Sequence, residues 1–206
     1  MNGEASPSAP SPPFWADAML RMVLPPRHRE SVSGDLLEEY RESVLPARGT
    51  RRADSWYVRQ AAGFVLRATW WWGVLSAAAV ITRTAFDWFV PPETFHARAV
   101  ATTYTAVAVF LAAGFFTAWR SRSLGAGALA GIATGLISAI LVVAGSLITL
   151  GLWHDERTLW AIERSGGLTE VFALPILILV PGTIVAALGG ALARVAVSIV
   201  HLSVIE

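Results

Sequence analysis

The hydrophobic residues of this chain gather into four long, almost uncharged stretches in its C-terminal two thirds. An α-helix needs roughly 20 such residues to cross the hydrocarbon core of a membrane. The pattern predicts membrane spans over about 66–88, 99–119, 124–153 and 171–193. We therefore expect an all-α integral membrane protein, with a four-helix bundle over 66–193 and a short helical segment before it.

The first predicted span is the shortest, because only 15 residues separate Arg67 from Arg83. At least one of these arginines must then extend its guanidinium to a headgroup region. Aromatic residues flank the stretch on both sides, as is typical of membrane interfaces: Trp70–Trp72 before it, and Trp88 and Phe89 after it.

The residues before the first span predict short helices. Residues 1–13 are rich in proline and serine and are expected to be a disordered lead. An amphipathic helix over 14–24 should stop at Pro25 and Pro26, and a third helix should begin near Thr50 and run into the first span. Between them, about 28–45 carries apolar residues at helical spacing: Val32, Leu36, Leu37, Tyr40 and Val44. Together these helices make a predicted segment over 14–65.

Composition supports lipid as the solvent of the spans. Hydrophobic residues make up 54% of the 206 residues, charged residues 15%, and the mean hydropathy is +0.54. One core of this size cannot hide so much apolar surface. The chain has no cysteine, which excludes disulfides, thiolate catalysis and cysteine metal sites.

Arginine distribution predicts the orientation. Taking Arg67 and Arg83 as the two boundaries of the first span, twelve of the 16 arginines lie before it, between the second and third spans, or after the fourth, and only four lie on the other side. That side carries six acids: Asp87, Glu93, Asp155, Glu156, Glu163 and Glu170. This is the positive-inside pattern. Both termini are expected in the cytoplasm of a bacterial cell, with the spans in its inner (plasma) membrane and 194–206 as an amphipathic tail on the inner surface.

Three short motifs occur in order before the first span: MLRMVLPP at 19–26, GDLLEEYRE at 34–42 and ADSWYVRQ at 53–60. With them, residues 16–60 resemble the permease prefix domain at the N-terminus of acidobacterial-type duplicated orphan permeases. The resemblance implies a cytoplasmic helical module attached to a membrane anchor. It does not carry over active transport, because the chain lacks the long extracytoplasmic domain and permease core of that family.

A charged cluster in this segment is the candidate for partner docking: Asp35, Glu38, Glu39, Tyr40, Arg41 and Glu42. Mixed charges at i, i+3 and i+4 also form solvated helix faces held by weak intrahelical pairs. Spacing alone leaves both interpretations open, and the prefix resemblance favours docking.

The last two spans each contain a feature with two interpretations. Gly127, Gly131 and Gly135 repeat every four residues in the third span, and such a groove lets helices approach closely in lipid. It packs either another span of the same chain or a second copy, as a homo-oligomer seam. Pro175 and Pro181 in the fourth span indicate a kink rather than a transporter site, because no charged side chain accompanies them.

No arrangement of residues indicates an enzyme. Arg83 and Asp87 stand at i, i+4, which favours charge neutralisation at the interface over proton relay. Three adjacent residues, HDE at 154–156, cannot all face one metal ion, and Ser146 has no histidine at its depth to act as base. We expect no catalytic residue, cofactor or metal site. Interleaved acids and arginines in the N-terminal segment also argue against nucleic-acid binding.

These observations predict a non-enzymatic multi-pass membrane protein that acts as an interaction or regulatory module. Its cytoplasmic helices would dock a protein partner, with a permease-type system as a candidate. The alternative is a small transporter subunit or an oligomeric channel. A channel needs facing polar groups, and these spans offer mostly threonine and serine hydroxyls that can bond to their own helix.

Overall fold

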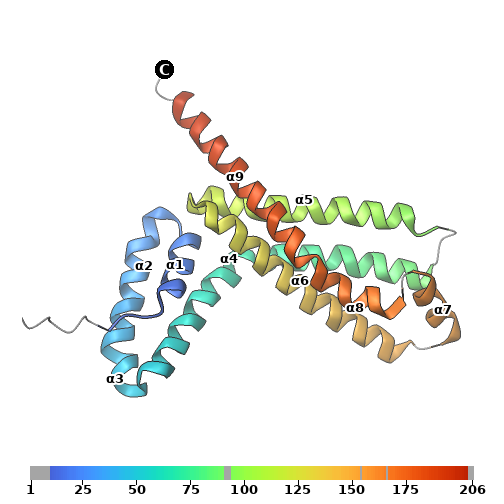
Figure 1. The fold of residues 1–206 in the computed structure, drawn as a ribbon, viewed down its shortest axis with the longest axis horizontal. Coiled ribbons are helices and arrows are strands. Elements are labelled where there is room, and N and C mark those ends of the chain that lie inside the picture. Colours follow the sequence, from blue (N-terminus) through green and yellow to red (C-terminus); the bar gives the residue numbers. More distant parts are fainter. Residues whose placement is uncertain (1–9, 91–93, 154, 166, 204–206) are drawn as a thin grey trace, which may run out of the picture.

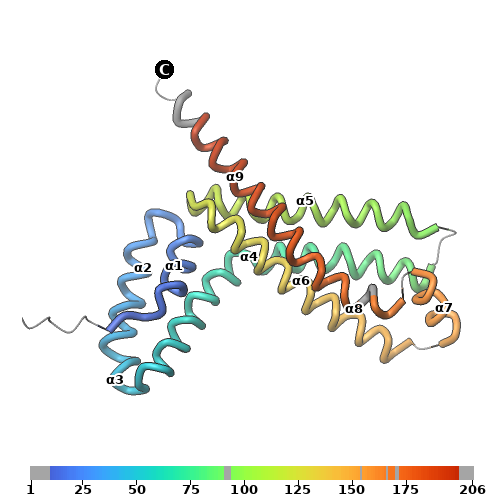
Figure 2. The backbone as a smooth tube through the Cα atoms, viewed as in Figure 1, coloured from blue at the N-terminus to red at the C-terminus, as the bar shows by residue number. Residues whose placement is uncertain are grey.

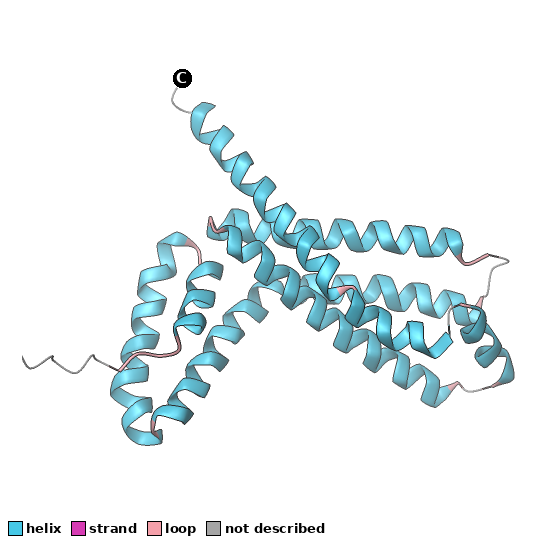
Figure 3. Ribbon diagram, in the orientation of Figure 1, coloured by secondary structure: helices cyan, strands magenta, loops and turns pink. Residues whose placement is uncertain are grey.

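The computed structural model describes residues 10–90, 94–153, 155–165 and 167–203. Every regular element in these ranges is helical (Figure 3). Glu93, His154 and most of the predicted disordered lead lie outside the described residues.

The N-terminal segment contains α1 (Phe14–Val23), α2 (Pro26–Glu39), a π-helical turn η1 (Tyr40–Val44) and α3 (Leu45–Arg48). Pro25 and Pro26 separate α1 from α2, as expected, and Pro26 also begins α2, where a missing N–H costs nothing. The helix expected over about 28–45 continues past Pro46 to Arg48. In a regular α-helix the Pro46 ring would clash with the Glu42 carbonyl, and the wider turn at η1, closed from Leu45 N–H to Tyr40 O, relieves this.

Helix α4 (Thr50–Phe89) begins after Gly49, whose φ of 71° a glycine adopts without strain. Its first part packs on α1, α3 and η1 around a core of alanine, leucine, valine and tyrosine side chains, and the rest joins the bundle (Figure 1). The helix expected from Thr50 and the first predicted span are therefore one continuous helix of 40 residues.

The bundle continues with α5 (His96–Ser121), α6 (Leu124–Leu152), α7 (Glu156–Arg164), α8 (Gly167–Leu177) and α9 (Leu179–Ser203). Among the described residues, four helical stretches are long and apolar enough to cross a membrane: α4, α5, α6, and α8 with α9. Facing residues show that α4 and α6 run in the same direction, as do α5 and α9, whereas α6 and α9 are antiparallel. The bundle therefore alternates in direction along the chain.

Two parts of the bundle differ from the sequence-based expectation. The loop after α6 contains α7, which we did not predict and which buries Thr158, Ala161 and Ile162. The residues expected to form a separate tail after Arg194 continue α9 without a break to Ser203, and this part of α9 extends beyond the other helices (Figure 2).

The break between α8 and α9 is small. Ile178 N–H donates to Leu174 O (3.0 Å), and Gly182 N–H donates to Ile178 O (2.8 Å), so hydrogen bonding continues across it. This agrees with a proline kink rather than an unwound binding site.

Candidate functional site

Asp17 on α1 joins α1 to α2 and to the first part of α4. Its Oδ1 accepts hydrogen bonds from Ser33 Oγ on α2 (3.0 Å) and from Tyr57 OH on α4 (2.8 Å). Its Oδ2 pairs with Arg21 Nε on α1 (2.7 Å). A carboxylate that accepts from three elements holds them in one arrangement.

The tyrosines beside Asp17 extend this polar core. Tyr40 OH donates to Asp54 Oδ1 (2.7 Å), and the Tyr40 and Tyr57 rings meet edge to face at 5.9 Å. Burial, together with the hydrogen bond to Asp54, raises the pKa of Tyr40 to about 12. Burial alone would raise the pKa of Asp17, but hydrogen bonds from Tyr57, Arg21 and Ser33 outweigh it and lower that pKa.

Four of the predicted docking residues lie exposed on one stripe of α2 and η1: Asp35, Glu38, Glu39 and Glu42, here called the acidic stripe. Within the described part of the chain, none of these carboxylates has a hydrogen bond or an ion pair. Arg41 is exposed and donates from Nε to Pro10 O (3.0 Å) rather than to a carboxylate. The intrahelical pairs of the alternative interpretation are therefore not formed at these acids.

Tyr40 must be removed from the predicted docking residues. Its side chain is fully buried in the core of the N-terminal segment and bonds to Asp54, so a partner cannot reach it. It lies on the apolar face with Val44, as its helical spacing indicated.

The N-terminal segment is attached to one end of the bundle, here called the near end, through the turn between α5 and α6. Arg29 Nη2 on α2 donates to Ser121 O (2.9 Å), and Arg194 Nη1 on α9 donates to Arg122 O (2.9 Å). Carbonyls at a helix C-terminus attract cations, so both guanidinium groups stabilise this turn. Met22 on α1 also lies against Gly125 at the start of α6.

The glycine stripe of the third span packs inside the chain. A Cβ on Gly127 would lie 3.0 Å from Gly190 Cα, and one on Gly131 would lie 2.8 Å from Thr183 Cα. A Cβ on Gly135 would lie 2.6 Å from a methyl group of Leu179. All three neighbours belong to α9. The groove expected as a possible homo-oligomer seam is therefore occupied by the same chain.

A second small-residue crossing, between α5 and α9, was not predicted. A Cβ on Gly114 would overlap the backbone of Ala186, and one on Gly189 would overlap the Leu111 carbonyl. Helix α9 thus fits between α5 and α6 at backbone-to-backbone distance. In the sequence, the adjacent glycines Gly189 and Gly190 were the signal that could have predicted this close crossing.

The other end of the bundle, the far end, holds a buried charge cluster. Asp87 is 2% exposed and pairs with Arg83 Nε (3.1 Å) and with Arg98 Nη1 (3.2 Å). Arg98 also donates to Phe86 O (2.8 Å) and Val90 O (2.9 Å) at the end of α4. The expected neutralising pair Arg83–Asp87 is present, and Arg98 is a further member that sequence spacing did not reveal.

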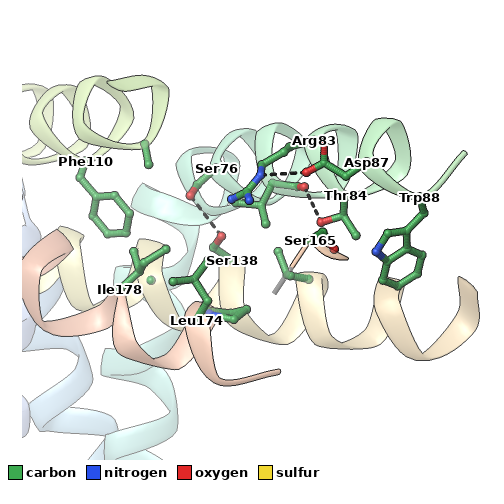
Figure 4. A pocket seen from close by; sticks show the side chains of 15 residues that line it. Ser76, Arg83, Thr84, Asp87, Trp88, Phe110, Ser138, Ser165, Leu174 and Ile178 are labelled. Atoms are coloured by element: carbon green, nitrogen blue, oxygen red, sulfur yellow. Dashed lines mark hydrogen bonds and ion pairs between the residues drawn. The ribbon is translucent and has the colours of Figure 1, made fainter. Parts of the chain in front are cut away.

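A cavity of about 50 Å³ lies beside this cluster (Figure 4). Its polar lining includes the Arg83–Asp87 pair and the hydrogen bond from Ser138 Oγ to Ser76 Oγ (3.1 Å). Small-molecule sites measure about 300–1,000 Å³, so this cavity has room for a few waters only.

Nine hydroxyls in the four long stretches donate to a carbonyl of their own helix, at i−4. The donors are Thr69, Thr84, Thr102, Thr103, Thr105, Ser121, Thr149, Thr183 and Ser198. Such hydroxyls have used their donor on the backbone and keep only oxygen lone pairs for another group. Among the described residues no group of three His, Cys, Asp or Glu side chains could hold a metal ion. In the HDE run, Asp155 Oδ1 accepts from Thr158 Oγ1 (2.6 Å) at the start of α7.

Comparison of this chain with models of protein families, with curated proteins and with solved structures finds no match.

Proposed function

We propose that this chain is a multi-pass membrane protein of the bacterial inner membrane whose N-terminal segment docks a protein partner on the cytoplasmic side. The first support is the exposure of its apolar surface. In the most apolar windows of α4, α5 and α6, only 33%, 22% and 22% of the residues are buried inside the protein. Large side chains such as Ile140 and Ile148 on α6 remain more than 60% exposed. Lipid is the solvent that such a surface fits.

The arginines support the orientation. Arg67, Arg120, Arg122 and Arg194 belong to the near end, together with the arginine-rich N-terminal segment. The far end carries fewer arginines, and two of them pair with Asp87. The positive-inside rule places the near end, and with it both termini, in the cytoplasm.

One observation carries the docking proposal: the carboxylates of the acidic stripe are exposed and unpaired, and the helices that carry them are fixed by buried contacts. Asp17, the two tyrosines and α4 hold the helices under the stripe, and Arg29 attaches them to the bundle. Because the backbone under the carboxylates is already fixed, binding of a basic partner has to order only their side chains. We therefore assign the protein to adaptor or regulatory proteins without catalytic activity, with a permease-type system as the candidate partner.

The transporter or channel alternative receives less support. Nine hydroxyls of the long stretches donate to their own helices, and the cavity beside the Arg83–Asp87 pair and the Ser76–Ser138 bond has room for a few waters only. Flux through purified protein in liposomes would reverse this ranking.

The test is photocrosslinking in intact cells from position 38, with position 51 on exposed α4 as the control site. We expect a crosslinked species from position 38 only. The double variant Glu39→Lys, Glu42→Lys, made with the crosslinker kept at position 38, should reduce it at least about tenfold, because charge reversal repels a basic partner. A matched double variant at the far end, Glu156→Lys with Glu163→Lys, should leave it unchanged. Absence of the species, or equal loss in both variants, refutes docking at the stripe.

A further inference from the structure

A groove separates the N-terminal segment from the bundle at the near end. It has a volume of about 680 Å³ and is bounded by the corner between α1 and α2, by α4 and by α5. This volume lies in the range of small-molecule sites. His28, Arg67 and Arg120 line it, and no acidic side chain does so among the described residues.

The three basic side chains are available to a ligand. All are exposed, and within the described residues none has a hydrogen bond or an ion pair. Other arginines nearby are engaged: Arg29 and Arg194 bind the carbonyls of the α5–α6 turn. Arg67 and Arg120 therefore give the groove positive charge that none of the described carboxylates neutralises.

On each helix, an aromatic side chain lies one helical turn farther from the near end than the arginine does. Arg67 and Trp71 stand at i, i+4 on α4, and Phe116 and Arg120 stand at i, i+4 on the antiparallel helix α5. Residues four apart share a helix face and differ by about 6 Å along the axis. Trp72 stacks on Phe116 with ring centroids 5.8 Å apart and fixes the aromatic level between the helices.

We propose that this groove binds the headgroup of one anionic phospholipid of the inner leaflet. His28, Arg67 and Arg120 hold the phosphate and the headgroup, and Trp71 and Phe116, which are 46% and 57% exposed, contact the glycerol and the first acyl carbons. Basic side chains at the near end followed by aromatic ones match a lipid, which has a charged headgroup above apolar carbons. A free anion has no apolar part for the aromatic side chains to contact. This inference rests on the proposed membrane insertion and orientation.

The test uses the full-length protein in detergent, titrated with dioctanoyl phosphatidylglycerol and followed by native mass spectrometry. We expect one bound lipid per chain and at least about tenfold weaker binding of dioctanoyl phosphatidylcholine. The double variant Arg67→Gln, Arg120→Gln should weaken phosphatidylglycerol binding at least about tenfold. Arg122→Gln, which removes an exposed charge at the same end but outside the groove, should change it less than twofold.

Three results would overturn the proposal: equal binding of the two lipids, equal loss in Arg122→Gln, or displacement by an equal concentration of inorganic phosphate. The comparison of the two lipids needs no variant, so it remains decisive where the double variant fails to fold. Alkaline extraction of cell membranes tests insertion separately. If the chain resists extraction but shows no preference for the anionic lipid, the lipid site is refuted and membrane insertion is not.

Discussion

Replacing Gly131 by leucine tests the close contact between α6 and α9. The leucine Cβ would lie 2.7 Å from Ala186 Cβ and 2.8 Å from Thr183 Cα, whereas ordinary contacts begin at 3.4 Å. Neither neighbour can rotate away, because one is a backbone atom and the other is bonded directly to the backbone. The helices must therefore separate by about 0.7 Å for the Cβ alone, and further for the three remaining carbons.

Overpacking by a few carbons costs about 1–3 kcal/mol in a well-packed interior. Since four carbons enter a groove that fits none, we expect Gly131→Leu to lower the free energy of unfolding by at least about 3 kcal/mol. Gly151→Leu is the matched control. It lies on the same helix, makes the same substitution, and has no atom of another helix within 4 Å of its Cβ.

The assay is unfolding by sodium dodecyl sulfate in mixed micelles, followed by tryptophan fluorescence, with size-exclusion chromatography of both variants. We expect Gly131→Leu to unfold at lower detergent fraction and Gly151→Leu to match the unaltered protein or exceed it. Equal stability of the two variants would refute close packing of α6 on α9. A clean change from dimer to stable monomer would show instead that the stripe faces a second copy.

Three further predictions concern the polar contacts. Asp17→Asn should destabilise the N-terminal segment by about 1–3 kcal/mol in chemical unfolding, and exposed Asp35→Asn should have little effect. The pKa of Asp17 is lowered from 3.8 in the folded state, so its contribution to the free energy of unfolding is present above about pH 4 and is lost as the pH falls through the lowered value. If the unaltered protein and Asp17→Asn lose stability identically on acid titration, this is contradicted. Arg29→Gln should release the N-terminal segment from the α5–α6 turn and speed hydrogen exchange there at least about tenfold, unlike Arg27→Gln on the same helix. Asp87→Asn should cost about 3 kcal/mol in the same detergent assay, because two arginines at the far end lose their carboxylate; a loss below about 0.5 kcal/mol would rule out this pairing.

The helices were predictable because they follow from local sequence patterns. Long apolar runs predicted the four long stretches, and the 3.6-residue period predicted the helices of the N-terminal segment. Helix α7 was missed because it is short and lies in a loop whose residues we used only to count charges for the orientation. Asp155 followed by Thr158 at its start was an available capping signal.

Contacts between distant parts of the chain were not predictable from spacing. Asp17 and Tyr57 are 40 positions apart, and Arg29 and Ser121 are 92 apart, so only the folded arrangement shows that they meet. The glycine repeat indicated a close helix contact but not that α9 fills it. Tyr40 was counted with its charged neighbours although its period placed it on the apolar face.

The most direct test of the account is the side of the membrane on which the acidic stripe lies. Because the chain has no cysteine, Glu38→Cys and Glu163→Cys each introduce a single thiol, at the N-terminal segment and at the far end. In intact cells, a maleimide that cannot cross the membrane should label position 163 and not position 38, and permeabilisation should expose both. Labelling of position 38 from outside intact cells, or recovery of the chain in the soluble fraction, would contradict the account.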